Sequence, residues 1–416
     1  MKLLSLNKVV LSALFSTIAL TACVDNAPTV EKSETTEQQA QRIAKQTLII
    51  DTHIDVPYRL EDEYEDVSKA TEKGDFDYPR AVAGGLNAPF MSIYIPSKLQ
   101  KTGGSKVLAD QLIDGIESIV NQSPDKFALA YSTQQIKDNF AKGIISLPMG
   151  MENGSPIEGE LANLQHFYER GIRYITLAHA KANHISDSSY DENRPAQGLT
   201  GFGKTLIVEM NKVGIMVDIS HVSDQAFYQV MEISKVPVIA SHSSARFFTP
   251  GFERNMSDDM IKLLAKNGGV IQMTFSGIFT SKKFRAQSAL YKVAKAAFIA
   301  ANKLDEELEA DKNKIDAFED DYTSEKPWEV GSLDLVLDHF EHVINLVGIE
   351  HVGIGSDFDG VDGILPKALK DVATYPNLIA GLLARGYCES DIEKLLSGNL
   401  MRVWQQVEKY AAEHNT

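Results

Sequence analysis

The sequence has two cysteines in 416 residues and no excess of positive charge. If Cys23 is modified, as argued below, Cys388 has no partner and no intrachain disulfide can form. A formal net charge of −16 argues against nucleic acid or an anionic membrane surface as a partner. The chain also lacks a convincing glycine-rich phosphate loop, a Gly-x-Ser-x-Gly elbow and a cysteine placed for nucleophilic attack. Nucleotide binding and serine or cysteine nucleophilic catalysis are therefore disfavoured.

The N-terminus has the features of an export signal. Lys2 and Lys8 precede an uncharged, mostly apolar run over residues 9–22, which is too short to span a bilayer. The run ends in Leu-Thr-Ala-Cys, which resembles the lipobox of bacterial lipoproteins. We expect residues 1–22 to be a lipoprotein signal peptide, Cys23 to carry lipid, and residues 23–37 to form a flexible tether. Val24, in place of aspartate, favours the periplasmic face of a Gram-negative-type outer membrane over the inner membrane.

Eight short apolar segments follow, most of them ending in polar or glycine residues. Stretches with helical periodicity separate most of them, which predicts a (β/α)8 TIM-type barrel with insertions over residues 38–416. Two doubly wound domains are the alternative, but the chemical residues recur at segment C-terminal ends, where barrels place their active sites. The segments are residues 47–54, 89–95, 143–149, 172–178, 214–219, 237–240, 268–275 and 351–355, and the helical stretches are 36–46, 107–122, 161–169, 205–212, 224–233 and 258–266.

Two long excursions interrupt this pattern. Residues 59–80 are acidic with few aliphatic side chains and are expected to form a long first βα loop. Residues 277–328 form an insertion with a helix expected at 288–302, followed by a charged run at 303–319. Such a run is usually a solvated helix face, although an excursion on the catalytic side could form a lid or a subunit contact.

Candidate metal ligands begin at the end of the first segment. Side chains alternate along a strand, so Asp51, His53 and Asp55 point to the same side. Such groups are costly beside an apolar strand unless they are paired or bind a metal. His-x-Asp is a suitable half-site for a divalent transition metal, because imidazole nitrogen and carboxylate oxygen can converge on one ion.

The other segments end in the same residue types. A lone histidine after a strand is more often structural, but four of ten at corresponding places, with carboxylates nearby, favour a shared site. These ligands exceed the needs of one tetrahedral zinc and fit two ions bridged by a carboxylate, which indicates hydrolytic chemistry. Beyond His53 and Asp55, the residues at or after segment ends are Glu152, His179, His221, His242, Asp357 and Asp359.

The chain carries a series of longer motifs, in this order: Asp-x-His-x-Asp, Gly-Met-Glu-x-Gly, Arg-Tyr-Ile-Thr-Leu-x-His, Gly-Leu-Thr-x-Phe-Gly, Asp-Ile-Ser-His-Val-Ser, Pro-Val-Ile-Ala-Ser-His-Ser-Ser, Arg254-Asn255, Gly-Ser-Asp-Phe-Asp-Gly and Gly-Asn-Leu-Met-Arg. Their order and spacing resemble the membrane dipeptidase (renal dipeptidase) family, zinc peptidases of the amidohydrolase-like barrel type. The resemblance runs from about residue 47 to residue 410.

The resemblance implies two zinc ions per chain. His53 and Asp55 would bind one ion, His221 and His242 the other, and Glu152 both. A hydroxide that bridges the metals would attack the peptide bond.

The resemblance also implies how the substrate is held. His179 would contact it and stabilise the oxyanion, and Arg254, with Asn255 beside it, would bind the free carboxylate. Asp357 would carry a proton to the leaving amine as general acid and base. Asn153 stands where many members of this family have glycine, and Ser155 replaces a histidine of the animal members, so substrate preference could differ.

Three functions stay open at this point. The first is a zinc dipeptidase, often a homodimer in this family, that cuts dipeptides including L-Xaa-D-Xaa. The second is a related amidohydrolase that acts on N-acyl amino acids or β-lactams. The third is a non-catalytic binding lipoprotein, which the complete set of ligand types disfavours.

Overall fold

The chain enters its first strand from an N-terminal helix. The computed structural model describes residues 34–305 and 308–414, so the predicted signal peptide and the lipidation of Cys23 lie outside the described residues. Helix α1 (Thr36–Gln46) has the predicted bounds, because Thr35 and Gln38 form a capping box at its start. Residues 36 and 37 of the predicted tether are therefore helical.

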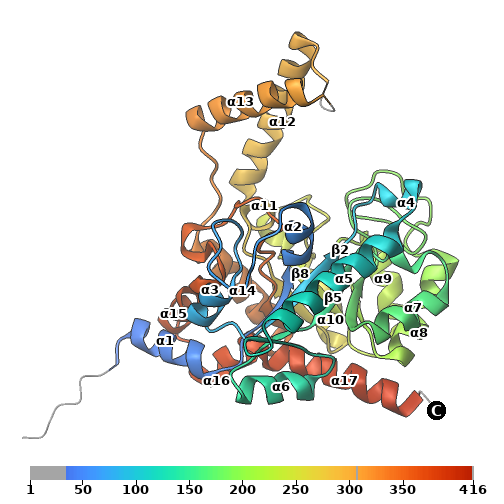
Figure 1. Ribbon diagram of the computed structural model, residues 1–416, viewed down its shortest axis with the longest axis vertical. Coiled ribbons are helices and arrows are strands. Elements are labelled where there is room, and N and C mark those ends of the chain that lie inside the picture. The colour runs from blue at the N-terminus through green and yellow to red at the C-terminus, as the bar shows by residue number, and fades with distance from the viewer. Residues whose placement is uncertain (1–33, 306–307, 415–416) are drawn as a thin grey trace, which may run out of the picture. The chain divides into compact units, whose positions relative to one another are not determined.

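Eight parallel strands form the centre of the fold, and the prediction of a (β/α)8 barrel is confirmed (Figure 1). Two backbone hydrogen bonds join the first strand to the segment after the last: Asp55 donates to Phe358 and Asp357 donates to His53. The strands in sheet order are β1 (Ile50–Ile54), β2 (Ala88–Tyr94), β5 (Met149–Glu152), β6 (Ile172–Thr176), β7 (Met216–Asp218), β8 (Ile239–Ser243), β9 (Val270–Met273) and β10 (Val352–Ile354).

Helices alternate with these strands (Figure 1). Besides α1, three helices have the predicted bounds, and side-chain caps explain two of their starts, at Ser223 and Ser257. Beyond α1, the helices are α2 (Val56–Asp62), α3 (Tyr78–Gly84), α4 (Leu99–Thr102), α5 (Ser105–Gln122), α6 (Thr133–Ala141), α7 (Leu161–Glu169), α8 (Gly201–Val213), α9 (Asp224–Ile233), α10 (Asp258–Lys266), α11 (Gly277–Thr280), α12 (Lys282–Asn302), α13 (Glu309–Glu325), α14 (Leu333–Val347), α15 (Tyr375–Ala384), α16 (Glu389–Glu393) and α17 (Asn399–His414).

The third predicted segment, residues 143–149, is wrong as a barrel strand. Its centre is β4 (Ile145–Leu147), which pairs with β3 (Phe127–Leu129) in a separate two-stranded sheet. Pro148 follows, and proline has no N–H to donate to a ladder. Its carbonyl instead accepts from Met91 of β2, and the barrel strand begins at the next residue.

The long insertion forms two packed helices, α12 and α13. Helix α12 begins before the predicted residue 288, because Ser281 caps it by accepting from the N–H of Phe284. The rings of Phe298 and Phe318 stack with centroids 4.4 Å apart and join the two helices. The predicted first βα loop, residues 59–80, likewise includes the end of α2 and the start of α3.

The N-terminal end of the barrel is filled by apolar side chains. Trp404 of α17 is buried there with residues that begin the strands, such as Ile50, Met216 and Val270. Its ring lies 5.4 Å from that of Phe90. In the described part of the chain, no helix is long and apolar enough to cross a membrane.

Candidate active site

The residues expected to bind metal, together with the predicted catalytic residues His179 and Asp357, come together at the C-terminal end of the barrel. His53 and His242 lie within β1 and β8, and Glu152 is the last residue of β5. Asp55, His179, His221 and Asp357 come from the loops that follow β1, β6, β7 and β10. All seven side chains are largely buried, and their convergence is what a parallel barrel predicts for strand ends.

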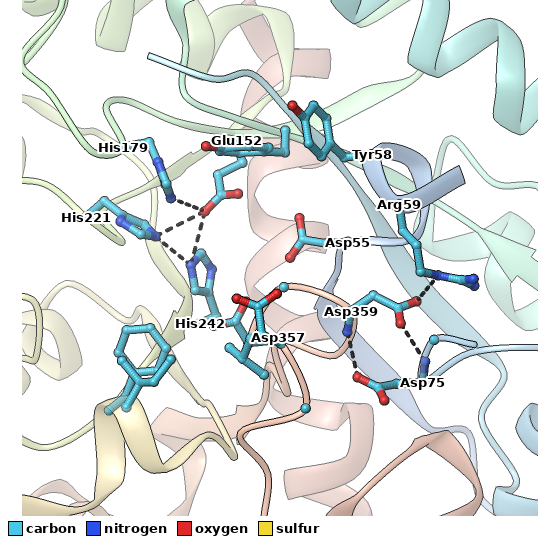
Figure 2. A pocket seen from close by; sticks show the side chains of 18 of the residues that line it. Asp55, Tyr58, Arg59, Asp75, Glu152, His179, His221, His242, Asp357 and Asp359 are labelled. Carbon is cyan, nitrogen blue, oxygen red and sulfur yellow. Dashed lines mark hydrogen bonds and ion pairs between the residues drawn. The ribbon is translucent and has the colours of Figure 1, made fainter. Parts of the chain in front are cut away.

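Glu152 stands at the centre of this group (Figure 2). Its Oε2 lies 3.6 Å from Nε2 of His53. Its Oε1 lies 3.1 Å from Nε2 of His221, 3.3 Å from that of His242 and 3.6 Å from that of His179. The two oxygens of one carboxylate therefore face two different sets of ligands.

The donor set fits divalent cations. Three overlapping groups each bring their ligand atoms within 4.8 Å of one another, and two of these groups share Glu152. Nε2 of His53 and Oδ1 of Asp55 are buried without a hydrogen-bond partner among the described residues. Nε2 of His221 lies 2.8 Å from Nε2 of His242. Buried imidazoles and carboxylates packed in this way are the usual ligands of zinc. The three groups are His53, Asp55 and Glu152; Glu152, His221 and His242; and His53, His242 and Asp357.

The protonation states agree with this chemistry. Burial lowers the pKa of His221 and of His242 well below the ordinary value, with nearby positive charge as a further cause, so both imidazoles are neutral. Burial opposes ionisation of Glu152, but the charges of His179 and His53 hold its pKa well below the ordinary value. Burial raises the pKa of Asp357 to about 7, against the charge of His53. A carboxyl group with such a pKa can both accept and release a proton.

Several site residues adopt strained backbone conformations. His221 and Asp357 have φ angles of 66° and 68°, in the left-handed region that non-glycine residues rarely occupy. Asn153 has a φ of 72°, and asparagine tolerates this region better than most residues. Its side chain donates to the carbonyl of Ile95. Neither Asn153 nor Ser155 is among the residues that line the cavity over Glu152.

Two buried aspartates hold the loops of the site: Asp218, which was not predicted, and Asp51, which the sequence placed on the same side of the strand as His53. Asp218 accepts the backbone N–H of Ser220 at 3.0 Å and that of Ser241 at 2.8 Å. Asp51 accepts those of His53 and Ser356, both at 3.0 Å. Each carboxylate thus ties its own strand end to a neighbouring one and fixes the residues beside the histidines. Each aspartate stands two residues before the N–H that it accepts, at His53 or Ser220, and this spacing is the sequence signal that could have identified both.

Tyr174 is a further residue of the site that was not predicted from the sequence. Its hydroxyl lies 2.8 Å from Nδ1 of His53, and such a bond orients the ring and leaves Nε2 free for a metal. A Cβ at Gly150 would lie 2.0 Å from Cζ of Tyr174, so only glycine leaves room for this ring. A glycine within a strand signals such a close approach.

The residues predicted to bind the substrate differ in whether they line the cavity at the site. Asp55, Glu152, His179 and Asp357 line a cavity of about 720 Å³. Arg254 is buried beside it, with its guanidinium carbon 5.1 Å from the ring centroid of Phe279, which does line the cavity. The structure does not bring Asn255 to the cavity, because its amide donates to Thr249 and to the carbonyl of Phe279. Asp359 also lines the cavity, but it pairs with Arg59 and does not join the group around Glu152.

Comparison with known proteins gives a consistent set of relatives. The family model described as membrane dipeptidase (peptidase family M19) matches residues 37–416. Dipeptidase 3 of Mus musculus is 31% identical over 382 residues, covering 89% of this chain and 67% of the mouse protein. Dipeptidase tcpJ of Claviceps purpurea (strain 20.1) is 31% identical over 346 residues, covering 82% of this chain and 71% of the fungal protein.

Solved structures agree in fold. The probable dipeptidase PvdM from Pseudomonas aeruginosa has a TM-score of 0.75 and 26% identity, covering 90% of this chain and 99% of that one. A metallopeptidase from Rhodobacter sphaeroides, liganded with a phosphinate mimic of the dipeptide L-Ala-D-Ala, has a TM-score of 0.71 and 23% identity. The two chains are covered to 87% and 99%, and this likeness shows the fold alone.

Asp218→Ala tests the role of the buried aspartate clamp. Two backbone N–H groups would lose their partner, so we expect a loss of about 3 kcal/mol in the free energy of unfolding. Metal affinity should fall about 10- to 100-fold, because the loops carrying His221 and His242 lose their support. Denaturant unfolding and metal titration measure the two effects. Asp259→Ala, at an exposed position of α10, is the matched control. Unchanged stability and affinity in Asp218→Ala would exclude this role.

Proposed function

The chain belongs to the membrane dipeptidase family, peptidase family M19, and we propose that it hydrolyses dipeptides with the help of two zinc ions. Metallo-dipeptidase activity follows from the family. The number and identity of the ions are our inference, and one observation carries it: Glu152 turns one oxygen to His53 and the other to His221 and His242. A carboxylate between two such ligand sets suits a pair of neighbouring cations.

The ligand assignment follows the two sides of Glu152. His53 and Asp55 would hold one ion, and His221 and His242 the other. Bound zinc supplies Lewis acidity, which lowers the pKa of a water molecule and offsets negative charge on a substrate oxygen. The ligand side chains are buried, which strengthens the charge interactions among them.

The remaining residues would act on the dipeptide. Arg254 is suited to the free carboxylate, because a guanidinium fork matches its two oxygens and its Nε has no partner among the described residues. His179 would donate to the oxygen that gains charge in the transition state. Asp357, with its pKa near neutrality, would take a proton from the attacking water and pass it to the leaving amine.

The substrate range is proposed to include dipeptides with a D-residue at the C-terminal position. The phosphinate in the similar Rhodobacter sphaeroides structure mimics L-Ala-D-Ala, which supports this choice. A cavity of about 720 Å³ falls within the usual size of small-molecule sites.

Removal of metal tests the paired-ion site. A chelator should abolish hydrolysis of an L-Xaa-L-Xaa and L-Xaa-D-Xaa panel, zinc should restore it, and elemental analysis should give two ions per chain. His221→Ala should bind one ion and lose about a thousandfold in kcat/KM, since it removes a metal that stabilises charge by several kcal/mol. His184→Ala, outside the site, is the control. Metal-replete protein that leaves the whole panel uncut would contradict the proposal.

Amidated dipeptides separate a dipeptidase from an amidohydrolase acting on other small amides. If Arg254 binds the free carboxylate, amidation should lower kcat/KM about 100-fold, the scale of a charged hydrogen bond. Arg254→Lys should reduce this discrimination, because lysine keeps the charge but loses the fork. Arg285→Lys, next to Phe252, is the control for a nearby cation. Equal cleavage of acids and amides by the unaltered enzyme would favour the alternative.

The location of the enzyme is proposed from the sequence alone. Leu-Thr-Ala-Cys supports lipidation of Cys23 and attachment to the periplasmic face of an outer membrane. Family resemblance supports a homodimer, which sedimentation velocity would measure.

Cys23→Ser tests the lipid anchor. The variant should lose labelling by radioactive palmitate and move from the membrane to the soluble fraction, because the acyl chains provide the attachment. Cys388→Ser, which alters the exposed cysteine of the folded domain, should keep both the label and the location. Absence of label in the unaltered protein would refute lipidation.

A further inference from the structure

One end of the cavity is strongly acidic. Besides Asp55, Glu152 and Asp357, four more carboxylates line the cavity, and they come from the end of α2, the loop before α3 and the loop after β10. Arg59 is the only arginine or lysine among the described residues that line the cavity. The four further carboxylates are Asp62, Asp75, Asp359 and Asp362.

Arg59 is already occupied by other partners. Its Nε donates to Asp359 at 3.2 Å (Figure 2). Its Nη1 donates to Glu65 at 2.7 Å and its Nη2 to the carbonyl of Phe76 at 3.3 Å. The charge of Arg59 is therefore balanced by two carboxylates, one of which lies outside the cavity lining.

Three carboxylates of the cavity form no ion pair within the described chain. The carboxylates of Asp62 and Asp362 are exposed and form neither a hydrogen bond nor an ion pair with any described residue. Asp75 accepts the backbone N–H of Asp359 at 2.9 Å but forms no ion pair within the described chain. Burial raises the pKa of Asp75 against the charges of Arg80 and Arg59, so a further cation beside it would stabilise the ionised carboxylate.

The proposed function sets the direction in which a dipeptide lies. Nη2 of Arg254 donates to the backbone carbonyl of His242. The guanidinium proposed to bind the substrate carboxylate therefore lies on the His242 side of Glu152. Figure 2 shows Arg59, Asp75 and Asp359 beyond Asp55, on the side away from His179 and His221. A substrate whose C-terminus is at Arg254 therefore turns its N-terminal residue toward the acidic end.

We propose that this enzyme prefers dipeptides with a cationic N-terminal side chain, lysine or arginine, and that Asp62, Asp75 and Asp362 determine this preference. The inference rests on the proposed dipeptidase function. Long cationic side chains can reach carboxylates several ångströms from the peptide bond. The cavity is open beside Gly363, one of its lining residues, because no atom lies within 4 Å of the position that a Cβ would take there. This space could accommodate a long side chain of the substrate.

A matched pair of substrates isolates the charge. Lys-Ala and norleucine-Ala have nearly the same length and shape, and only the first carries a positive side chain. We expect the zinc-loaded full chain to favour Lys-Ala in kcat/KM by about tenfold, the sum of a few screened carboxylate contacts. In the double variant Asp62→Asn/Asp362→Asn, the ratio should fall to about 2, with kcat/KM for norleucine-Ala unchanged. Glu61→Gln, an exposed neighbour outside this cavity, should keep the original ratio.

The outcomes separate this inference from the proposed function. Equal kcat/KM for the two substrates, or a ratio that survives in the double variant, would overturn the preference while dipeptidase activity stands. If the zinc-loaded chain cleaves none of Lys-Ala, norleucine-Ala and Ala-Ala, the proposed function is overturned and the preference with it. A lower kcat/KM for Lys-Ala in the double variant, with kcat/KM for norleucine-Ala unchanged and the Glu61→Gln control unaffected, would support the proposed role of these carboxylates.

Discussion

The site depends on one buried carboxylate that serves two sets of ligands. Glu152 is nearly enclosed, and four imidazole nitrogens lie between 3.1 and 3.6 Å from its oxygens. Burial of so many polar groups without a counter-charge costs several kcal/mol for each ionised group. Cations at this point would remove that cost, because they replace lost hydration with direct coordination. The same ions would supply the chemistry that a metallo-dipeptidase needs.

The barrel makes this arrangement possible through its topology. Parallel strands end at one rim, so residues from six distant parts of the chain meet there without long loops. Asp51 and Asp218 then play equivalent parts, because each accepts a backbone N–H from its own strand end and one from a neighbour. The strained conformations of His221 and Asp357 are held by these fixed surroundings. At the opposite end, the apolar packing around Trp404 leaves no comparable cluster among the described residues.

Much of the fold was predictable because local signals were strong. Helices α7, α9 and α10 have the predicted bounds, since their periodicity is regular and serine caps begin two of them. The third barrel strand was misplaced because the apolar run before Pro148 resembles a barrel strand, and only tertiary pairing assigns it to a separate sheet. Residues that converge on Glu152 were predictable from strand ends. Asp75, Asp218 and Tyr174 were not, because their roles depend on neighbours that are distant in sequence.

Anomalous diffraction at the zinc edge, from crystals of zinc-loaded protein, tests the paired-ion site most directly. Two peaks are expected about 3.5–4 Å apart, the usual spacing of two-metal sites. One should lie beside His53 and Asp55, the other beside His221 and His242, with the carboxylate of Glu152 between them. A single peak at this centre, or zinc bound only elsewhere, would contradict the bridging role of Glu152.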